Sequence, residues 1–165
     1  MYILSKQAGA QSSAVPVYPR RLFSQNHIFD KANARIEKAP DLVGKRSAIW
    51  AFQGTMSVLA KGDLQGEYGV PWREVECHTE RPEEILWSDD RVTLHRIPEG
   101  RTGADLLISG DVDVYIDCHP PEEIFTDPVV RWVFPDPGSK CRWYFDEHDN
   151  YPIMHVVGFR EDLGE

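Results

Sequence analysis

The chain has 165 residues, of which 41% are hydrophobic and 27% are charged, and its net charge at pH 7 is −9. These values are typical of a globular protein with one domain, long enough to form a core without disulfides or metals. An acidic chain repels a phosphate backbone, which excludes general nucleic-acid binding, and no apolar run approaches the roughly 18 residues needed for membrane insertion.

Two regions follow one another along the chain. Residues 1–14 are expected to form a loosely packed amino-terminal segment, and residues 15–165 a single α/β domain. At their junction, residues 14–19 predict a short extended segment, because two prolines exclude the interior of a helix.

The first strand and helix are expected on either side of a polar turn. Residues 45–52 have the apolar character of a buried strand, which the turn Gln53-Gly54-Thr55 ends. Thr55 is expected to cap a helix that ends near residues 66–69. Residues 72–78 and 91–97 predict two further strands.

The second half of the chain continues this alternation. Residues 102–109 predict a short helix that Thr102 caps and Gly110 ends, and residues 111–117 predict the clearest strand. A second short helix is expected after Pro120-Pro121. The acidic run 80–90 predicts a solvated surface, and residues 146–149 a loop.

The alternation of strands and helices predicts an α/β domain with a largely parallel sheet. We expect one mixed sheet to contain the strands at 45–52, 72–78, 111–117 and 153–159.

Seven stretches follow one another along the chain: VPVYPRR at 15–21, DLVGKR at 41–46, LQGEYGV at 64–70, IPEGRT at 97–102, LISGDVD at 107–113, FPDP at 134–137 and YPIMH at 151–155. In this order they resemble the 4,5-dihydroxyphthalate decarboxylase family, whose members are built like type 2 periplasmic solute-binding proteins, with two lobes around a cleft. The resemblance implies a partial chain: a second lobe, with a mostly parallel mixed sheet flanked by helices, and two hinge-crossing strands.

The same resemblance implies a carboxy-lyase that removes carbon dioxide from an aromatic dicarboxylate without a cofactor. Two alternatives remain open. One is a non-catalytic protein that binds a small anion for a transporter, and the other is an inactive truncated remnant. The absence of a signal-peptide pattern at residues 1–6, with only three cysteines, predicts a cytoplasmic location.

The candidate substrate-binding residues are Arg20, Arg21, Gly54 and Thr55. A guanidinium pairs with a carboxylate through two hydrogen bonds, so one arginine is expected to point into the cleft. The amides around Gly54 and Thr55 are expected to hold a second anionic oxygen. The simpler alternatives are a solvated arginine pair and an ordinary helix cap.

The candidate catalytic residues are His155 and, as second choice, His119, either of which could give a proton to the ring carbon. The alternatives are a structural strand histidine and a histidine in a turn. Trp50 and Trp132 are expected to flank an aromatic ligand.

No metal site is predicted, because the pairs Cys77-His78 and Cys118-His119 lack the spacing of zinc ligands. Adjacent residues of a strand also point to opposite faces, so each pair offers only one ligand to a face. Apolar residues of the two hinge strands are expected to be exposed, so a homo-oligomer is possible.

Overall fold

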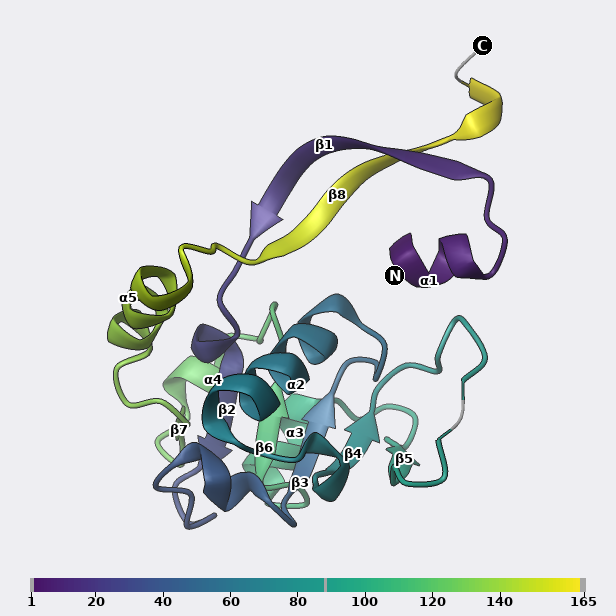
Figure 1. Cartoon of the computed structure of the whole chain (residues 1–165). Helices are drawn as coiled ribbons and strands as arrows, with labels where there is room; N and C mark the ends of the chain where they lie inside the picture. Colours follow the sequence, from purple (N-terminus) through teal and green to yellow (C-terminus); the bar gives the residue numbers. More distant parts are fainter. Residues whose placement is uncertain (1, 88, 164–165) are drawn as a thin grey trace.

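A computed structural model describes residues 2–87 and 89–163 (Figure 1), so the predicted boundaries at Met1 and at residue 165 lie outside the described part. The chain forms two β-sheets. One has six strands and is surrounded by helices, and the other is a two-stranded ribbon that projects from it. None of the described helices combines the length and the apolar character needed to cross a membrane.

The six-stranded sheet is mixed and mostly parallel. Its strands lie side by side in the order β5 (Leu94–Arg96), β4 (Glu76–Thr79), β3 (Arg46–Ile49), β6 (Val114–Ile116), β2 (Ile28–Lys31) and β7 (Val130–Trp132). The four strands from β5 to β6 are parallel, whereas β2 is antiparallel to both of its neighbours. This architecture confirms the predicted α/β class.

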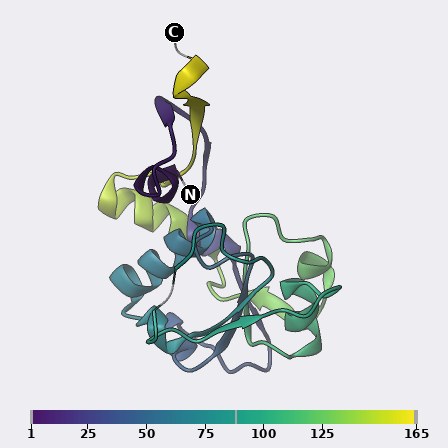
Figure 2. The same ribbon diagram turned by 90° about the vertical axis from the view of Figure 1, so that its right-hand side faces the viewer.

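Helices cover both faces of this sheet (Figure 2). Alternating residues of β2, β3 and β6 divide between two apolar clusters, as the two-residue period of a strand requires. Ile49 packs in the cluster that includes α2 (Thr55–Tyr68). Ala48 packs in the other, which includes α3 (Gly103–Ser109) and α4 (Glu123–Thr126).

The helix α3 lies so close to the sheet that its first residue has to be glycine. A Cβ atom at Gly103 would lie 2.7 Å from the ring of Tyr115 and 3.0 Å from the Cβ atom of Ala48. The preceding Thr102 caps the helix as predicted, since its hydroxyl accepts the amide of Asp105 at 3.1 Å.

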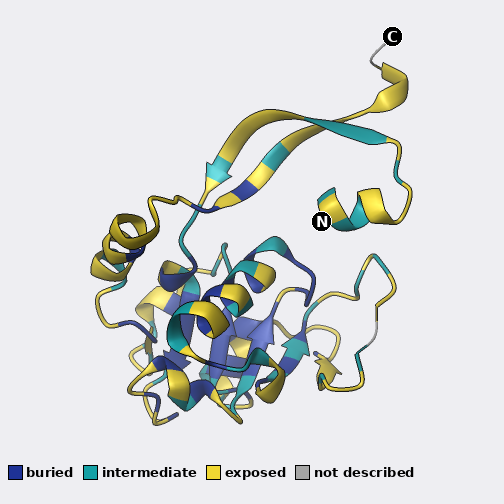
Figure 3. Ribbon diagram, viewed as in Figure 1, coloured by how far each residue is buried: buried dark blue, intermediate teal, exposed yellow. Residues whose placement is uncertain are grey.

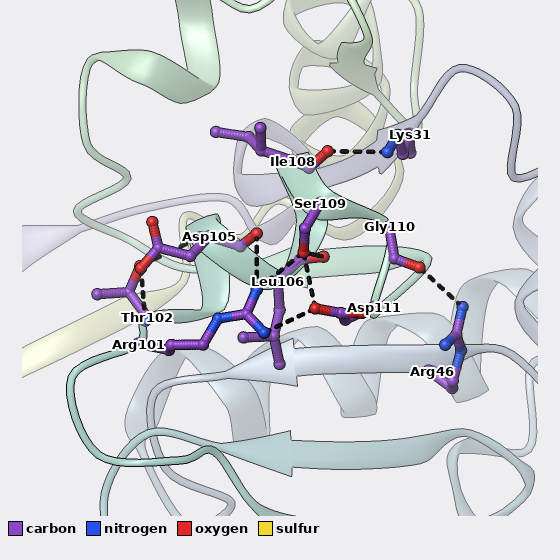
Figure 4. A network of polar contacts seen from close by, with 10 residues as sticks. All are labelled: Lys31, Arg46, Arg101, Thr102, Asp105, Leu106, Ile108, Ser109, Gly110 and Asp111. Carbon is purple, nitrogen blue, oxygen red and sulfur yellow. Dashed lines mark hydrogen bonds and ion pairs between the residues drawn. The ribbon is translucent and has the colours of Figure 1, made fainter.

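The last turn of α3 is fixed by a cation from the sheet (Figure 4). Lys31 of β2 donates to the carbonyl of Ile108 at 2.8 Å. A positive charge at the carboxyl end of a helix meets the negative end of its dipole, so this contact stabilises the helix against the sheet.

The ribbon pairs β1 (Ser12–Arg21) with β8 (Ile153–Arg160) in antiparallel register, with Arg20 opposite His155. Its surface is largely exposed, in contrast to the buried inner strands β2, β3 and β6 of the six-stranded sheet (Figure 3). The predicted exposure of apolar hinge residues is confirmed at Val15, Val17, Ile153 and Val157.

Both connections between the ribbon and the larger sheet meet at one buried carboxylate, Asp63 of α2. Ser24, in the short helix η1 (Ser24–His27) after β1, donates to Asp63 Oδ2 at 2.6 Å. Tyr144, in α5 (Pro137–His148) before β8, donates to Asp63 Oδ1 at 3.3 Å. Burial raises the pKa of Asp63, because desolvation penalises the charged form.

The predicted place of residues 153–159 in the mixed sheet was wrong. They form a strand, β8, but its partner is β1. An apolar pattern predicts that a segment is extended, but it does not say which strand pairs with it.

Two local predictions were also wrong. Gly54 is the N-cap of α2 and Thr55 is its first helical residue. Residues 146–149 are not a loop, because α5 continues to His148 and ends at Asp149 in the left-handed conformation. The helix α5 begins with Asp136 as N-cap followed by Pro137, a start signal that the sequence analysis did not use.

The remaining helices are short. They are α1 (Tyr2–Gln7), which has no buried residue, η2 (Ala39–Leu42), η3 (Trp72–Glu74) and η4 (Glu161–Leu163). The helix η3 occupies the start of the strand predicted at 72–78, so β4 begins only at Glu76.

Replacing Asp63 by Ala should lower the free energy of unfolding by about 1–3 kcal/mol, because a buried hydroxyl of Ser24 loses its acceptor. Asp63→Asn should cost less, since an amide oxygen can still accept that bond. Urea denaturation monitored by circular dichroism measures both. Asp146→Ala, at an exposed position of α5, is the control. Equal losses for Asp63→Ala and Asp146→Ala would contradict the assignment.

Candidate functional site

A cavity of about 480 Å³ lies where the ribbon meets the larger sheet. The parallel strands β3 and β6 are neighbours, so the segments that follow them leave from the same edge of the sheet. The start of β8 adds a third side. The lining residues are Trp50, Gly54, Thr55, Met56, Ser57, Ile116, Asp117, Cys118, His119, Met154 and His155.

Arg20, on the ribbon, contacts two residues that line the cavity. Its Nη2 donates to the carbonyl oxygen of Cys118 at 3.0 Å, and its Nη1 contacts Nε2 of His119. A guanidinium has no lone pair to offer, so Nε2 of His119 is the acceptor in this contact. Arg20 therefore joins β1 to the loop after β6 and brings a permanent positive charge to the edge of the cavity.

His119 is oriented by the residues before it. Asp117 accepts the backbone amide of His119 at 2.7 Å through Oδ1, and the hydroxyl of Tyr115 at 2.8 Å through Oδ2. Burial, and then the charge of Asp117, raises the pKa of Tyr115, so its hydroxyl keeps its proton. The carboxylate thus fixes the loop that carries His119.

The side chains of Asp117, Cys118 and His119 come close enough together to suggest metal ligands. Hydrogen bonds within the protein already use both oxygens of the carboxylate, and Arg20 contacts His119. Burial raises the pKa of the Cys118 thiol, which opposes the thiolate form that binds metals. This cluster is therefore poorly suited to binding a metal ion.

The amino end of α2 forms another side of the cavity. Gly54 is its N-cap and has no side chain, so the amides of the first turn, at Thr55, Met56 and Ser57, receive no side-chain cap. These amides and the helix dipole favour an anion at this position.

A carboxylate of the protein already occupies the adjacent amides of the same turn. Glu83 accepts the amide of Phe52 at 2.6 Å and that of Gln53 at 2.9 Å. Glu80 likewise accepts the amide of Gly103 at 2.6 Å. The prediction that the acidic run 80–90 is only a solvated surface was therefore wrong, because two of its members cap backbone amides.

Arg21 does not belong to this arrangement. Its Nη1 donates to the carbonyl of Tyr151 at 3.2 Å, and its guanidinium lies over the ring of Tyr18. Trp132 also lies elsewhere, on β7, where its Nε1 donates to the carbonyl of Asn26. Of the predicted site residues, the structure brings together Arg20, Gly54, Thr55, His119 and His155.

Met154 and Asp117 are among the cavity residues that sequence reasoning missed. Met154 precedes His155 and lines the cavity although it is buried. Asp117 was assigned only to a strand, yet it lies directly after β6 and orients His119. Its place at the carboxyl end of a predicted parallel strand was the signal that could have identified it.

The chain is similar in sequence to two curated proteins that share one name. No family model matches the chain. It is 32% identical over 160 residues to a 4,5-dihydroxyphthalate decarboxylase of Comamonas testosteroni, covering 92% of this chain and 48% of that protein. It is also 32% identical over 141 residues to a 4,5-dihydroxyphthalate decarboxylase of Pseudomonas putida, covering 79% of this chain and 54% of that protein.

The fold is similar to that of a solved structure, the periplasmic aliphatic sulphonate binding protein SsuA of Escherichia coli. The TM-score is 0.54 at 17% identity, over 90% of this chain and 47% of that protein. The chain spans about half the length of the curated relatives it matches. Over that half, the chain has the periplasmic-binding-protein-like fold and resembles the 4,5-dihydroxyphthalate decarboxylases, as its sequence predicts.

Proposed function

We propose that the cavity binds a small aromatic dicarboxylate and that the chain supplies part of a decarboxylase site. The observation that supports this most is the convergence of His119, His155 and the amino end of α2 on one cavity, with Arg20 in contact with His119. The names of the two relatives support the reaction, because both are 4,5-dihydroxyphthalate decarboxylases.

Two groups at the cavity would bind the two carboxylates of the ligand. Arg20 offers parallel N–H donors to one of them. The first-turn amides of α2 offer donors and a positive dipole end to the other. The indole of Trp50, 46% exposed at the edge of the cavity, is placed to contact an aromatic ring.

The proposed reaction breaks the bond between one ring carbon and its carboxylate. A histidine gives a proton to the ring carbon that carries the carboxylate, and a hydroxyl para to that carbon donates electron density that stabilises the protonated ring. The bond to the carboxylate then breaks, carbon dioxide leaves, and the bonding electrons return to the ring and restore its aromaticity. We assign the role of proton donor first to His155, because Nε2 of His119 is already occupied by Arg20.

The alternative is that the chain binds a small anion without chemistry. The similarity of the fold to a sulphonate-binding protein favours it. Both functions need Arg20 and the end of α2, but only the decarboxylase needs a proton donor. The cytoplasmic location stays a prediction and would distinguish the two, since transporter-linked binding proteins work outside the cytoplasm.

Replacing Arg20 by Ala should weaken the binding of phthalate by about tenfold or more, since a charge-assisted contact is lost. Titration calorimetry measures the affinity. Arg21→Ala is the matched control, because the neighbouring arginine donates to Tyr151 instead. Equal losses for the two variants would argue against this site.

Replacing His155 by Gln should lower the rate of carbon dioxide release from 4,5-dihydroxyphthalate by about 100-fold or more, with little change in phthalate affinity. His148→Gln, in α5 and away from the cavity lining, is the control. Binding without carbon dioxide release by the parent chain would favour the anion-binding alternative. Neither binding nor release would favour the inactive remnant.

The exposed apolar residues of the ribbon should also drive self-association, giving a homo-oligomer. Light scattering over a hundredfold concentration range measures this. A monomer throughout that range would contradict the expectation, whereas Val17→Lys should reduce the mean mass if the ribbon is the contact.

A further inference from the structure

Three potential metal ligands meet on the outer strands of the six-stranded sheet. Glu76 and His78 are two residues apart on β4, so they point to the same face. His95 of β5 is the direct partner of His78 in the parallel register. The two imidazole rings stack with centroids 4.9 Å apart.

The nitrogens of both histidines converge on one oxygen. Nε2 of His78 lies 3.1 Å and Nε2 of His95 3.0 Å from Oε1 of Glu76. One ligand atom from each residue can be chosen so that all three lie within 4.8 Å of one another. Glu76 and His78 come from β4 and His95 comes from β5. The register between these two strands therefore places the three side chains together.

These separations are close to those of a metal site. Zinc binds imidazole nitrogen and carboxylate oxygen at about 2.0–2.2 Å, which puts two ligands of a tetrahedron about 3.4 Å apart. The distances from Glu76 to the two histidines are therefore only a few tenths of an ångström too short. Small rotations of the side chains would admit an ion between them.

We propose that Glu76, His78 and His95 bind a late first-row divalent metal ion of the zinc class. Two imidazoles and one carboxylate are ligands that such ions prefer, and they leave a further position for water. The side chain of His78 is 18% exposed and that of His95 48% exposed, so the nitrogens are held in place yet reachable from solvent.

The surroundings leave these ligands available. Arg46 is the β3 neighbour of Glu76, but its guanidinium is bound by both oxygens of Asp113 at 3.0 and 3.1 Å. Cys77 lies in the buried cluster, and burial raises its pKa to about 11, so it remains a thiol. The site therefore does not use the Cys77-His78 pair considered from the sequence.

This inference departs from the prediction of no metal site. The three ligands are separated along the chain by up to 19 residues, and only the pairing of β4 with β5 brings them together. A bound ion would link β5, an edge strand of three residues, to β4. None of the three ligands lines the cavity described above.

Titration of the metal-free chain with Zn²⁺ in a calorimeter tests the proposal. We expect one ion per chain, with an affinity that falls at least tenfold in His78→Ala and in His95→Ala. His148→Ala is the matched control, because His148 forms a similar 3.0 Å contact with Glu67 that involves one histidine rather than two. The Zn²⁺ affinity of this variant should equal that of the parent chain.

Cobalt(II) provides a second measurement. Its absorption spectrum should show nitrogen and oxygen ligands, without the intense near-ultraviolet band of a thiolate. Cys118→Ser should leave both measurements unchanged. A thiolate band, or a loss of affinity in Cys118→Ser, would move the ion to the Asp117–His119 cluster and overturn the proposal.

Unfolding of a variant can be separated from loss of a ligand. Circular dichroism and thermal melting of each metal-free variant should match those of the parent chain. If His78→Ala fails to fold, His95→Ala decides, because half of the His95 side chain is exposed. Undiminished Zn²⁺ affinity in a folded His95→Ala variant would overturn the proposal, as would the absence of binding to the parent chain.

Discussion

The contact of Arg20 with the loop after β6 is the interaction on which the arrangement of the cavity depends. Arg20 belongs to the ribbon, whereas Cys118 and His119 belong to the loop that follows β6 in the larger sheet. A two-stranded ribbon is marginally stable alone, so its position must be fixed by contacts of this kind. The shared carboxylate of Asp63 fixes the connections behind it, and Arg20 fixes the side that faces the cavity.

Positive groups lie at the cavity although the chain as a whole is acidic. The net charge is −9, yet the cavity has a guanidinium at its edge and the positive end of a 14-residue helix in its wall. Glu83 shows that this turn can bind an anion, because its carboxylate accepts hydrogen bonds from two consecutive backbone amides. The amides of Thr55, Met56 and Ser57, further along the same turn, are also available as donors to an anion. The overall acidity of the chain favours a small anion over a polyanion.

Much of the core could be predicted because local rules decide it. Thr102 caps α3 through a hydroxyl, and apolar residues with the right period form β3, α2 and β6. The partner of β8 could not be predicted, since pairing depends on the whole topology. The sequence also could not tell whether Arg20 or Arg21 is directed toward the cavity. The register between β1 and β8 is irregular at these two residues, and this irregularity determines their directions. The proposed metal ligands Glu76, His78 and His95 were missed for the related reason that strand register is not visible in one sequence.

The contact between Arg20 and His119 has a consequence for the order of events in the proposed reaction. Nη1 and Nη2 of Arg20 both have partners in the protein, so a carboxylate that binds to the same two hydrogens has to displace His119 and Cys118. The ligand must therefore compete with the imidazole, and its arrival releases Nε2 of His119. An empty site would keep this nitrogen masked, and only an anion of the right size would expose a second group able to exchange protons. Selection of the ligand and readiness for proton transfer would then be one event.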